Sequence, residues 1–239
     1  MKNLIAICAL FALLFISCSD DSYVGEGPIV TEEIVIDAFS AIENIGSNNV
    51  EIEKGSVQKV EVTGHANIID RLKRDVSGNT WQIELQDGSY KNADLSVHIT
   101  VPEMNRAILE GSGMIVLNDF KSQEQVSLGI YGSGDIEVHG NEGCKNLNLE
   151  IEGSGSIFAL EEFSDNEITN LRIIGSGSII GYPLKAMNSS VDIVGSGTCK
   201  VSVESELKVR VEGSGTVYYK GNPTIDSSIS GSGKIIDAN

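Results

Sequence analysis

Gly-Ser-Gly is the short motif of this sequence that comes nearest to an anion-binding loop. A phosphate-binding glycine loop lies between a strand and the N-terminus of a helix, where a lysine or the helix dipole faces the phosphate. Here, the residues after each motif are rich in isoleucine and valine, as in a strand. The motif occurs seven times, starting at Gly111, Gly132, Gly153, Gly175, Gly195, Gly213 and Gly231. We therefore predict a structural turn and no nucleotide binding.

Carboxylates are the next candidates, because enzymes that cleave polysaccharides depend on them. A pectate-lyase-type enzyme needs clustered acidic residues for calcium and an arginine base, and a glycoside hydrolase needs two carboxylates about 5 to 9.5 Å apart. Glu110, Glu152 and Glu212 hold the same position of the repeat but belong to repeats 1, 3 and 6, too far apart to cooperate. We therefore predict that the protein is not an enzyme, and a pectate-lyase-like carbohydrate-active enzyme is the least favoured alternative.

The three histidines, His65, His98 and His139, are widely spaced and lack a companion at the spacing of a metal site. The serines form no Gly-x-Ser-x-Gly elbow between a strand and a helix. We interpret the histidines as surface residues and expect no catalytic residue, no metal and no cofactor.

Two aromatic residues are candidates for ligand contact. Phe158 and Tyr218 each stand five residues after the first glycine of a motif, in phase with positions that face outward. Exposed aromatic rings can stack on sugar rings, although single aromatic residues also occur on many protein surfaces. Phe158 and Tyr218 are therefore the predicted contacts of a glycan or protein partner.

The N-terminal residues have the pattern of a bacterial lipoprotein signal. A lysine precedes an apolar stretch, Leu4 to Ile16, that is too short to span a bilayer. Phe15 to Cys18, at the end of this stretch, resemble the lipobox of bacterial lipoproteins, whose cysteine becomes the lipidated N-terminus. We predict residues 1–17 as the signal peptide, Cys18 as the lipidation site and residues 18–30 as lipidated cysteine and flexible tether.

The predicted lipid anchor implies a location. Each acyl CH₂ group contributes about 0.8 kcal/mol on insertion, so several chains would hold the protein at the membrane without a transmembrane helix. Ser19, Asp20 and Asp21 resemble the acidic tag that directs lipoproteins of Bacteroidetes-type bacteria to the outer face of the outer membrane. We expect an outer membrane lipoprotein of the cell envelope that is exposed at the cell surface.

Acidic residues dominate the composition. The chain contains 17 basic and 34 acidic residues and has a formal net charge of −17. Such a surface repels nucleic acid, which we exclude as a partner, and opposes the capture of polyanions such as pectate unless calcium bridges the two. Only Cys144 and Cys199 follow the anchor. Cys199 replaces isoleucine or valine in the repeat, which favours a buried thiol.

The repeat predicts the elements that position these residues. The motifs follow one another at intervals of 18 to 22 residues, and the positions two before and four after the first glycine are apolar in all seven copies. Apolar residues alternate with others on the approach to the turn, as in a strand. Glycine at both outer positions fits a tight corner that needs positive φ or close backbone approach. Each repeat is therefore a strand, a turn, a second strand and a return loop.

Two ways of stacking the repeats are open, an antiparallel sandwich and a parallel solenoid. We favour the solenoid, because parallel stacking places like residues above like residues and explains the matching columns. It also places Glu150, Arg172, Asp192 and Arg210, of alternating charge, in one row. Neighbouring opposite charges would contribute about 0.2 to 1 kcal/mol per pair.

The region before the repeats contains strand-like segments and one short helix, predicted over residues 67–73 from the spacing of its apolar residues. With the Trp81–Leu85 strand and the run Val97–Pro102 into the first motif, this region resembles the putative auto-transporter adhesin family with the head GIN domain, found in Bacteroidetes lipoproteins. The resemblance covers residues 34–239. It implies an all-β, two-sheet parallel β-helix with Gly-Ser-Gly turns between the sheets, which we assign to residues 31–239 with the repeats over 105–239.

With the predicted anchor and the lack of a catalytic group of residues, the resemblance favours a non-enzymatic, lipid-anchored adhesin that binds a glycan or a protein through one face of the solenoid. A passive structural lipoprotein of the envelope is the alternative. Asn239 follows the last motif closely, with no capping sequence, which predicts an open final coil. Self-association through this coil is a further expectation.

Overall fold

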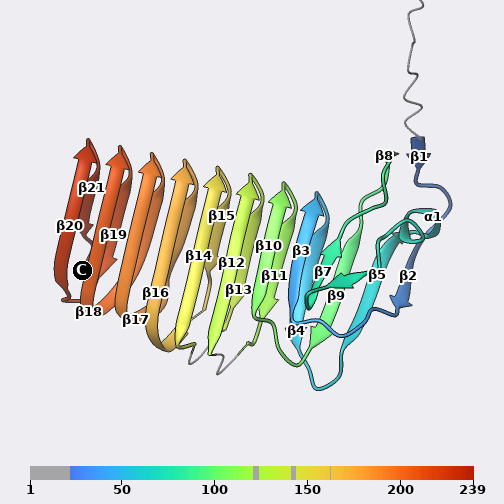
Figure 1. The fold of residues 1–239 in the computed structure, drawn as a ribbon, viewed down its shortest axis with the longest axis horizontal. Helices are drawn as coiled ribbons and strands as arrows, with labels where there is room; N and C mark the ends of the chain where they lie inside the picture. The colour runs from blue at the N-terminus through green and yellow to red at the C-terminus, as the bar shows by residue number, and fades with distance from the viewer. Residues whose placement is uncertain (1–21, 121–123, 141–143, 162) are drawn as a thin grey trace, which may run out of the picture.

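The computed structural model describes residues 22–120, 124–140, 144–161 and 163–239, and it is a two-layered parallel β-solenoid. In each coil of the repeats, one strand leads into a Gly-Ser-Gly turn and the next strand leaves it. We call the layer of strands before the turns the upstream sheet and the layer after them the downstream sheet. The coils stack along the long axis of the molecule, with the C-terminal coil at one end and the N-terminal region at the other (Figure 1).

The upstream sheet contains β7 (Thr80–Ile83), β3 (Ala41–Gly46), β10 (Arg106–Gly111), β12 (Gln125–Gly132), β14 (Asn146–Gly153), β16 (Phe163–Gly175) and β20 (Thr224–Gly231). The downstream sheet contains β2 (Ile29–Ile34), β5 (Lys59–His65), β9 (Ser96–Val101), β4 (Asn49–Lys54), β11 (Met114–Asn118), β13 (Asp135–His139), β15 (Ser156–Ala159), β19 (Thr216–Lys220) and β21 (Lys234–Asp237). The strands β17 (Ser178–Gly195) and β18 (Thr198–Gly213) run through both sheets. The remaining elements are β1 (Ser22–Val24), α1 (Ala66–Ile69), β6 (Val76–Ser77) and β8 (Ser89–Lys91).

The pairing of the coils confirms the predicted parallel register. The first glycine of each motif pairs with the first glycine of the next, from Gly111 to Gly231. The series begins one coil earlier than the seven motifs, because Gly46 pairs with Gly111. The sequence Gly46-Ser47-Asn48 therefore forms the first corner, with asparagine in the place of the third glycine.

The corners require glycine for two different reasons. The first glycine of each Gly-Ser-Gly motif has φ between +118° and +147°, which favours a residue without a side chain. The third glycine lies against the preceding corner: a Cβ atom on Gly155 would stand 2.2 Å from the carbonyl oxygen of Gly134. The serine between them donates its backbone N–H to the first glycine of the preceding corner at 2.8 to 3.0 Å. The row of motifs is thus a hydrogen-bonded edge of the solenoid.

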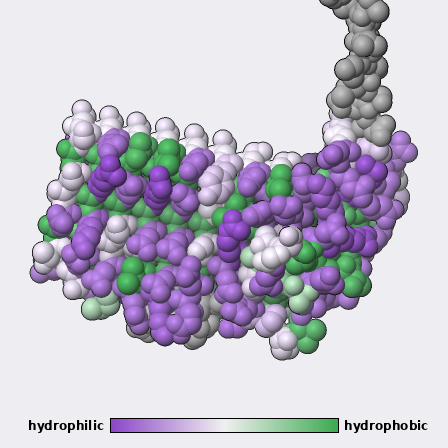
Figure 2. All heavy atoms as spheres, viewed as in Figure 1, coloured by the Kyte–Doolittle hydropathy of each residue, from purple (hydrophilic) through white to green (hydrophobic). Residues whose placement is uncertain are grey.

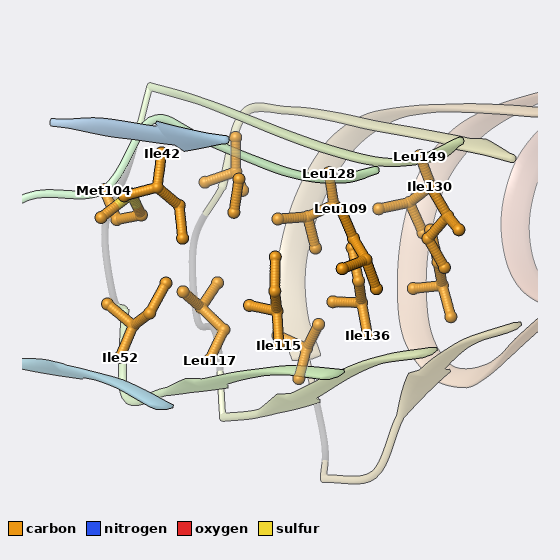
Figure 3. Close-up of a cluster of buried hydrophobic side chains, with 14 of the residues drawn as sticks. Ile42, Ile52, Met104, Leu109, Ile115, Leu117, Leu128, Ile130, Ile136 and Leu149 are labelled. Atoms are coloured by element: carbon orange, nitrogen blue, oxygen red, sulfur yellow. The ribbon is translucent and has the colours of Figure 1, made fainter. Parts of the chain in front are cut away.

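The core lies between the two sheets. Leu109 and Ile130 of the upstream sheet and Ile115 and Ile136 of the downstream sheet are fully buried, and their side chains project into the space between the layers (Figure 3). These residues are the apolar columns of the repeat. Because side chains alternate between the two faces of a strand, every second residue points into the core and the residues between them point outward.

The N-terminal end of this core is covered. Strand β5 pairs antiparallel with β9, and β2 pairs antiparallel with β5. Ile68 and Ile69 of α1 are buried there, as is Trp81, whose Nε1 donates to the carbonyl oxygen of Lys73 at 3.0 Å. The parallel stack therefore begins on an antiparallel cap.

Two boundaries differ from the sequence predictions. The helix predicted over 67–73 is one turn, Ala66–Ile69, because the chain then leaves the helix and Leu72 forms an antiparallel bridge with Leu85. Part of the segment predicted as a tether over 18–30 is β-strand in the described residues, because β1 pairs with β8 and β2 begins at Ile29.

The last coil of the described residues is paired on one side. Among the described residues, β20 pairs only with β18, and β21 pairs only with β19. Ile225 and Ile229, which are in phase with core positions, have exposed fractions of 38% and 42%. The two ends of the solenoid are therefore chemically different.

Candidate binding face

The two predicted contact residues lie in one row on the outer face of the downstream sheet. Phe158 pairs with Ile180, Ile180 with Lys200, and Lys200 with Tyr218. All four side chains are partly exposed. Because neighbouring strands are about 4.8 Å apart, the two aromatic positions are about 14 Å apart. They therefore belong to one surface without touching each other.

Two lysines and a second tyrosine accompany Tyr218. The Nζ atom of Lys200 lies 5.8 Å from the ring centroid of Tyr218 and 5.9 Å from that of Tyr182. The Nζ atom of Lys220 lies 4.8 Å from the ring centroid of Tyr182. These are cation–π distances. We call Tyr182, Lys200, Tyr218 and Lys220 the lysine–tyrosine patch.

Sequence reasoning identified only one member of this patch. Lys200 stands five residues after the first glycine of its motif, in the same column as Tyr218, and the aligned repeats contained that signal. Tyr182 and Lys220 both stand seven residues after their glycines. The register shifts between Gly181 and Lys185, however, so the alignment alone does not place the Tyr182 ring.

Charge is unevenly distributed along the outer face of the downstream sheet. Near the N-terminal end, this face carries the carboxylates of Glu51, Glu53, Asp135 and Glu137. The outward positions of β17, β18, β19 and β21 that pair in this sheet carry no carboxylate, and the exposed Glu204 follows Ser202 two residues further along β18. The outward positions without a carboxylate are Ser178, Ile180, Tyr182, Thr198, Lys200, Ser202, Thr216, Tyr218, Lys220, Lys234 and Ile236. The C-terminal part of the face is thus cationic, aromatic and hydroxylated.

The Tyr182 hydroxyl is kept in its neutral form. Burial raises the pKa of Tyr182, and the neighbouring Tyr218 raises it further. A phenol with a raised pKa remains a hydrogen-bond donor at neutral pH. Ser178, Thr198 and Thr216 pair in sequence and form a row of hydroxyl-bearing side chains beside the patch.

The outer face of the upstream sheet carries the alternating charges. Glu150, Arg172, Asp192 and Arg210 pair in sequence across four strands, which confirms the predicted row. The Nε atom of Arg172 lies 3.8 Å from a Glu150 carboxylate oxygen, and Arg210 bonds to Glu212 on its own strand. Figure 2 shows a broad face that is largely hydrophilic, with a pale row along the upper edge where upstream strands end in Figure 1. Arginines that already have carboxylate neighbours are poor anchors for an added ligand.

The three acidic residues that share one position of the repeat, Glu110, Glu152 and Glu212, do not stand on adjacent strands. Glu110 and Glu152 are separated by the strand of Tyr131, and the strands of Ile174 and Val194 lie between Glu152 and Glu212. The separations are about 10 Å or more at the usual strand spacing. Glu110 and Glu152 are therefore at the outer limit of the carboxylate separation that glycoside hydrolases use, and Glu212 lies beyond it.

The histidines contact single polar neighbours or acidic side chains of their own sheet. His65 bonds to Asn92, His139 lies 3.6 Å from Glu137, and His98 lies between Glu51 and Glu53. Across the part of the chain that the structure describes, no group of three or more His, Cys, Asp or Glu side chains is arranged to hold a metal ion.

The predicted lipidation site, Cys18, lies outside the described residues, as do the signal peptide and the acidic tag. Within the described ranges, no helix is both long enough and apolar enough to cross a bilayer. Cys144 and Cys199 are free and buried, so the two thiols do not form a disulfide.

Comparison with known proteins gives one family and several similar folds. The family model described as "Putative auto-transporter adhesin, head GIN domain" matches residues 38–223. No protein of curated function matches the sequence. A crystal structure of a putative adhesin from Bacteroides fragilis has a TM-score of 0.80 and 20% sequence identity, covering 89% of this chain and 98% of that one.

Two structures from Parabacteroides distasonis have the same fold. One, a putative lipid binding protein, has a TM-score of 0.75 and 24% identity, covering 92% of this chain and 100% of that one. The other, a putative adhesin, has a TM-score of 0.66 and 22% identity, with 90% and 99% coverage. At these identities, the structural likeness establishes the fold alone.

Proposed function

The chain belongs to the putative auto-transporter adhesin, head GIN domain family, and from this premise we propose that it is a non-enzymatic, lipid-anchored adhesin of the cell surface. In this proposal, it binds a glycan or a protein partner through the outer face of the downstream sheet. Phe158 and Tyr218 are the proposed contact residues.

The row that contains both aromatic side chains is the observation that carries the proposal. Phe158, Ile180 and Tyr218 stand on a regular β-sheet, whose backbone hydrogen bonds hold their spacing. A rigid platform of partly exposed aromatic and aliphatic side chains binds with a small loss of conformational entropy. An extended polymer could contact several strands of this platform at once.

The anchor is a separate part of the proposal and rests on the sequence before residue 22. Lipidated Cys18 would hold the protein in the outer membrane, with the solenoid exposed outside the cell. Cys18→Ser should release the protein from the membrane fraction without changing the fold. Protease treatment of intact cells should remove the solenoid, and a solenoid that survives such treatment would contradict surface exposure.

Binding is tested by retention of the purified solenoid on immobilised host glycans and extracellular matrix. Phe158→Ala and Tyr218→Ala should each weaken retention, and the double variant should abolish it. Tyr131→Ala is the matched control, because Tyr131 is an exposed aromatic residue on the opposite, upstream face. Equal retention of the wild type and the double variant would refute the proposed site.

The alternatives make distinct predictions in the same assay. A passive envelope component would be retained on none of the surfaces, although it would still be released from cells by Cys18→Ser. A carbohydrate-active enzyme would produce shorter fragments or unsaturated ends from a polysaccharide. Turnover of any polysaccharide would overturn the non-enzymatic assignment.

A further inference from the structure

We infer that the lysine–tyrosine patch selects an acidic glycan, a polymer whose sugar rings carry carboxylate or sulfate groups. This inference rests on the proposed binding function of the downstream face and names the class of ligand. The chain is strongly acidic, with a net charge of −17, yet the paired outward positions around the patch include lysines and no carboxylate.

The lysines of the patch differ from other lysines of the protein. Lys59, Lys73, Lys145 and Lys208 each lie within 4 Å of a carboxylate oxygen. Lys200 and Lys220 lie over tyrosine rings, and within the described residues neither forms a salt bridge. Because a ring engages one side of an ammonium group, N–H donors of Lys200 and Lys220 remain for an incoming anion.

The tyrosines and the hydroxyl row favour a sugar over a simple anion. Tyr182 and Tyr218 contribute partly exposed aromatic side chains with phenolic hydroxyls, and Thr198 and Thr216 add hydroxyls on the neighbouring row. A pyranose ring has apolar faces and a rim of hydroxyl groups, so it matches this combination. A carboxylate or sulfate on the same ring would then meet an ammonium group.

The net charge of the chain does not cancel this attraction at physiological salt. Glu137 shares a row with Lys200, but the strands of Phe158 and Ile180 lie between them, which gives a separation of about 14 Å. The Debye length at 0.15 M salt is about 8 Å. Salt therefore screens the repulsion between a bound anion and the acidic end of the face. It does not screen direct contact between the anion and the lysines. The patch can thus attract a polyanion although the chain as a whole is acidic.

The test compares polymers of different charge. The purified solenoid is titrated with polygalacturonate, heparin, neutral dextran and single-stranded DNA in 0.15 M salt, with EDTA present to exclude calcium bridging. We expect binding to polygalacturonate or heparin and weaker binding to dextran. The variant Lys200→Gln/Lys220→Gln should lose about tenfold or more in affinity for the acidic polymer, and Lys208→Gln, on the upstream face, should bind as the wild type does.

Each other outcome overturns the inference in a recognisable way. If dextran binds as tightly as the acidic polymers and only Tyr218→Ala weakens binding, the acidic specificity is wrong and the proposed binding face survives. If the lysine variant binds the acidic polymers as the wild type does, the patch does not select charge. DNA binding as tight as glycan binding would replace a glycan site with a general polyanion site. Binding of no polymer would refute the inference and restrict the proposed function to protein partners.

Discussion

Cys199 is a core residue whose size and polarity are constrained by the coils on either side. It occupies the position four residues after the first glycine, between Ile179 and Val217 of the neighbouring coils, and it is fully buried. Burial strongly raises the pKa of its thiol, so the group is neutral and behaves as a small apolar side chain.

We therefore expect Cys199→Val to change the free energy of unfolding by less than about 1.5 kcal/mol. Cys199→Ser should lower it by about 1 to 3 kcal/mol, because the hydroxyl would lose its hydration in an apolar core. Urea denaturation measures both values, and Thr198→Ser on the outward side of the same strand is the control. A serine variant as stable as the wild type would mean that this part of the core is hydrated.

For single residues, the sequence predicted which face of a strand a side chain occupies better than it predicted which side chains are in contact. The repeat alignment placed Cys199 inside and Phe158 and Tyr218 outside, because strand alternation alone decides the face. The partners of Tyr182 and the lysines could not be obtained in this way, since a cation–π contact depends on distances across strands and on side-chain orientation. The Cys18 lipidation and the predicted ligand contacts remain predictions.

The Gly-Ser-Gly corner is the element that closes each coil, and its three positions should differ sharply in tolerance. In Gly155→Ala, the new Cβ atom would stand 2.2 Å from the Gly134 carbonyl oxygen and 2.9 Å from Ile130 Cγ2. Backbone that is stacked between two coils cannot move far, so we expect a loss of about 3 kcal/mol or more in unfolding free energy. Ser154→Ala, at the exposed middle position, should change it by less than about 0.5 kcal/mol.

Gly46→Ala separates the requirement for positive φ from the requirement for close contact between corners. No atom lies within 4 Å of its added Cβ atom, but φ is +109°, so only backbone strain of about 1 to 3 kcal/mol is expected. Thermal and urea unfolding of the three variants should rank Gly155→Ala below Gly46→Ala and both below Ser154→Ala. Equal losses for the two glycine variants would show that contact between corners contributes nothing beyond the required φ.

The elements of the repeats could be predicted because parallel stacking makes every coil resemble the next. The pairing of the N-terminal strands could not be predicted, since these strands alternate without a repeat and alternation does not determine a partner or a direction. The antiparallel pairs β2–β5 and β5–β9 therefore emerged only in the structure. The length of α1 was also beyond the sequence. The apolar spacing predicted a helix to residue 73, but the bridge between Leu72 and Leu85 ends it earlier.

The whole molecule has unlike ends, and this difference bears on self-association. At the N-terminal end, the edge strand β2 carries Glu32 and Glu33, and Glu33 lies 3.8 Å from Lys59. Charged residues on an edge strand oppose further pairing. At the C-terminal end, Ile225 and Ile229 are substantially exposed at positions that correspond to the core.

If a second copy covers the C-terminal coil, pairing of two such ends gives a closed, two-fold dimer, whereas pairing with the β2 edge would give a growing filament. The charged β2 edge favours the dimer. We expect sedimentation velocity to show a species of twice the chain mass that appears with rising concentration and grows no further.

The variant Ile229→Lys should shift this equilibrium to the monomer, because it places a charge among the apolar groups that would be buried. Ser230→Lys is the matched control, because the adjacent residue points to the outer face of the same strand. A wild-type solenoid that stays monomeric at high concentration would exclude association through this end. Continued growth into long assemblies would show instead that the charged β2 edge does not prevent pairing.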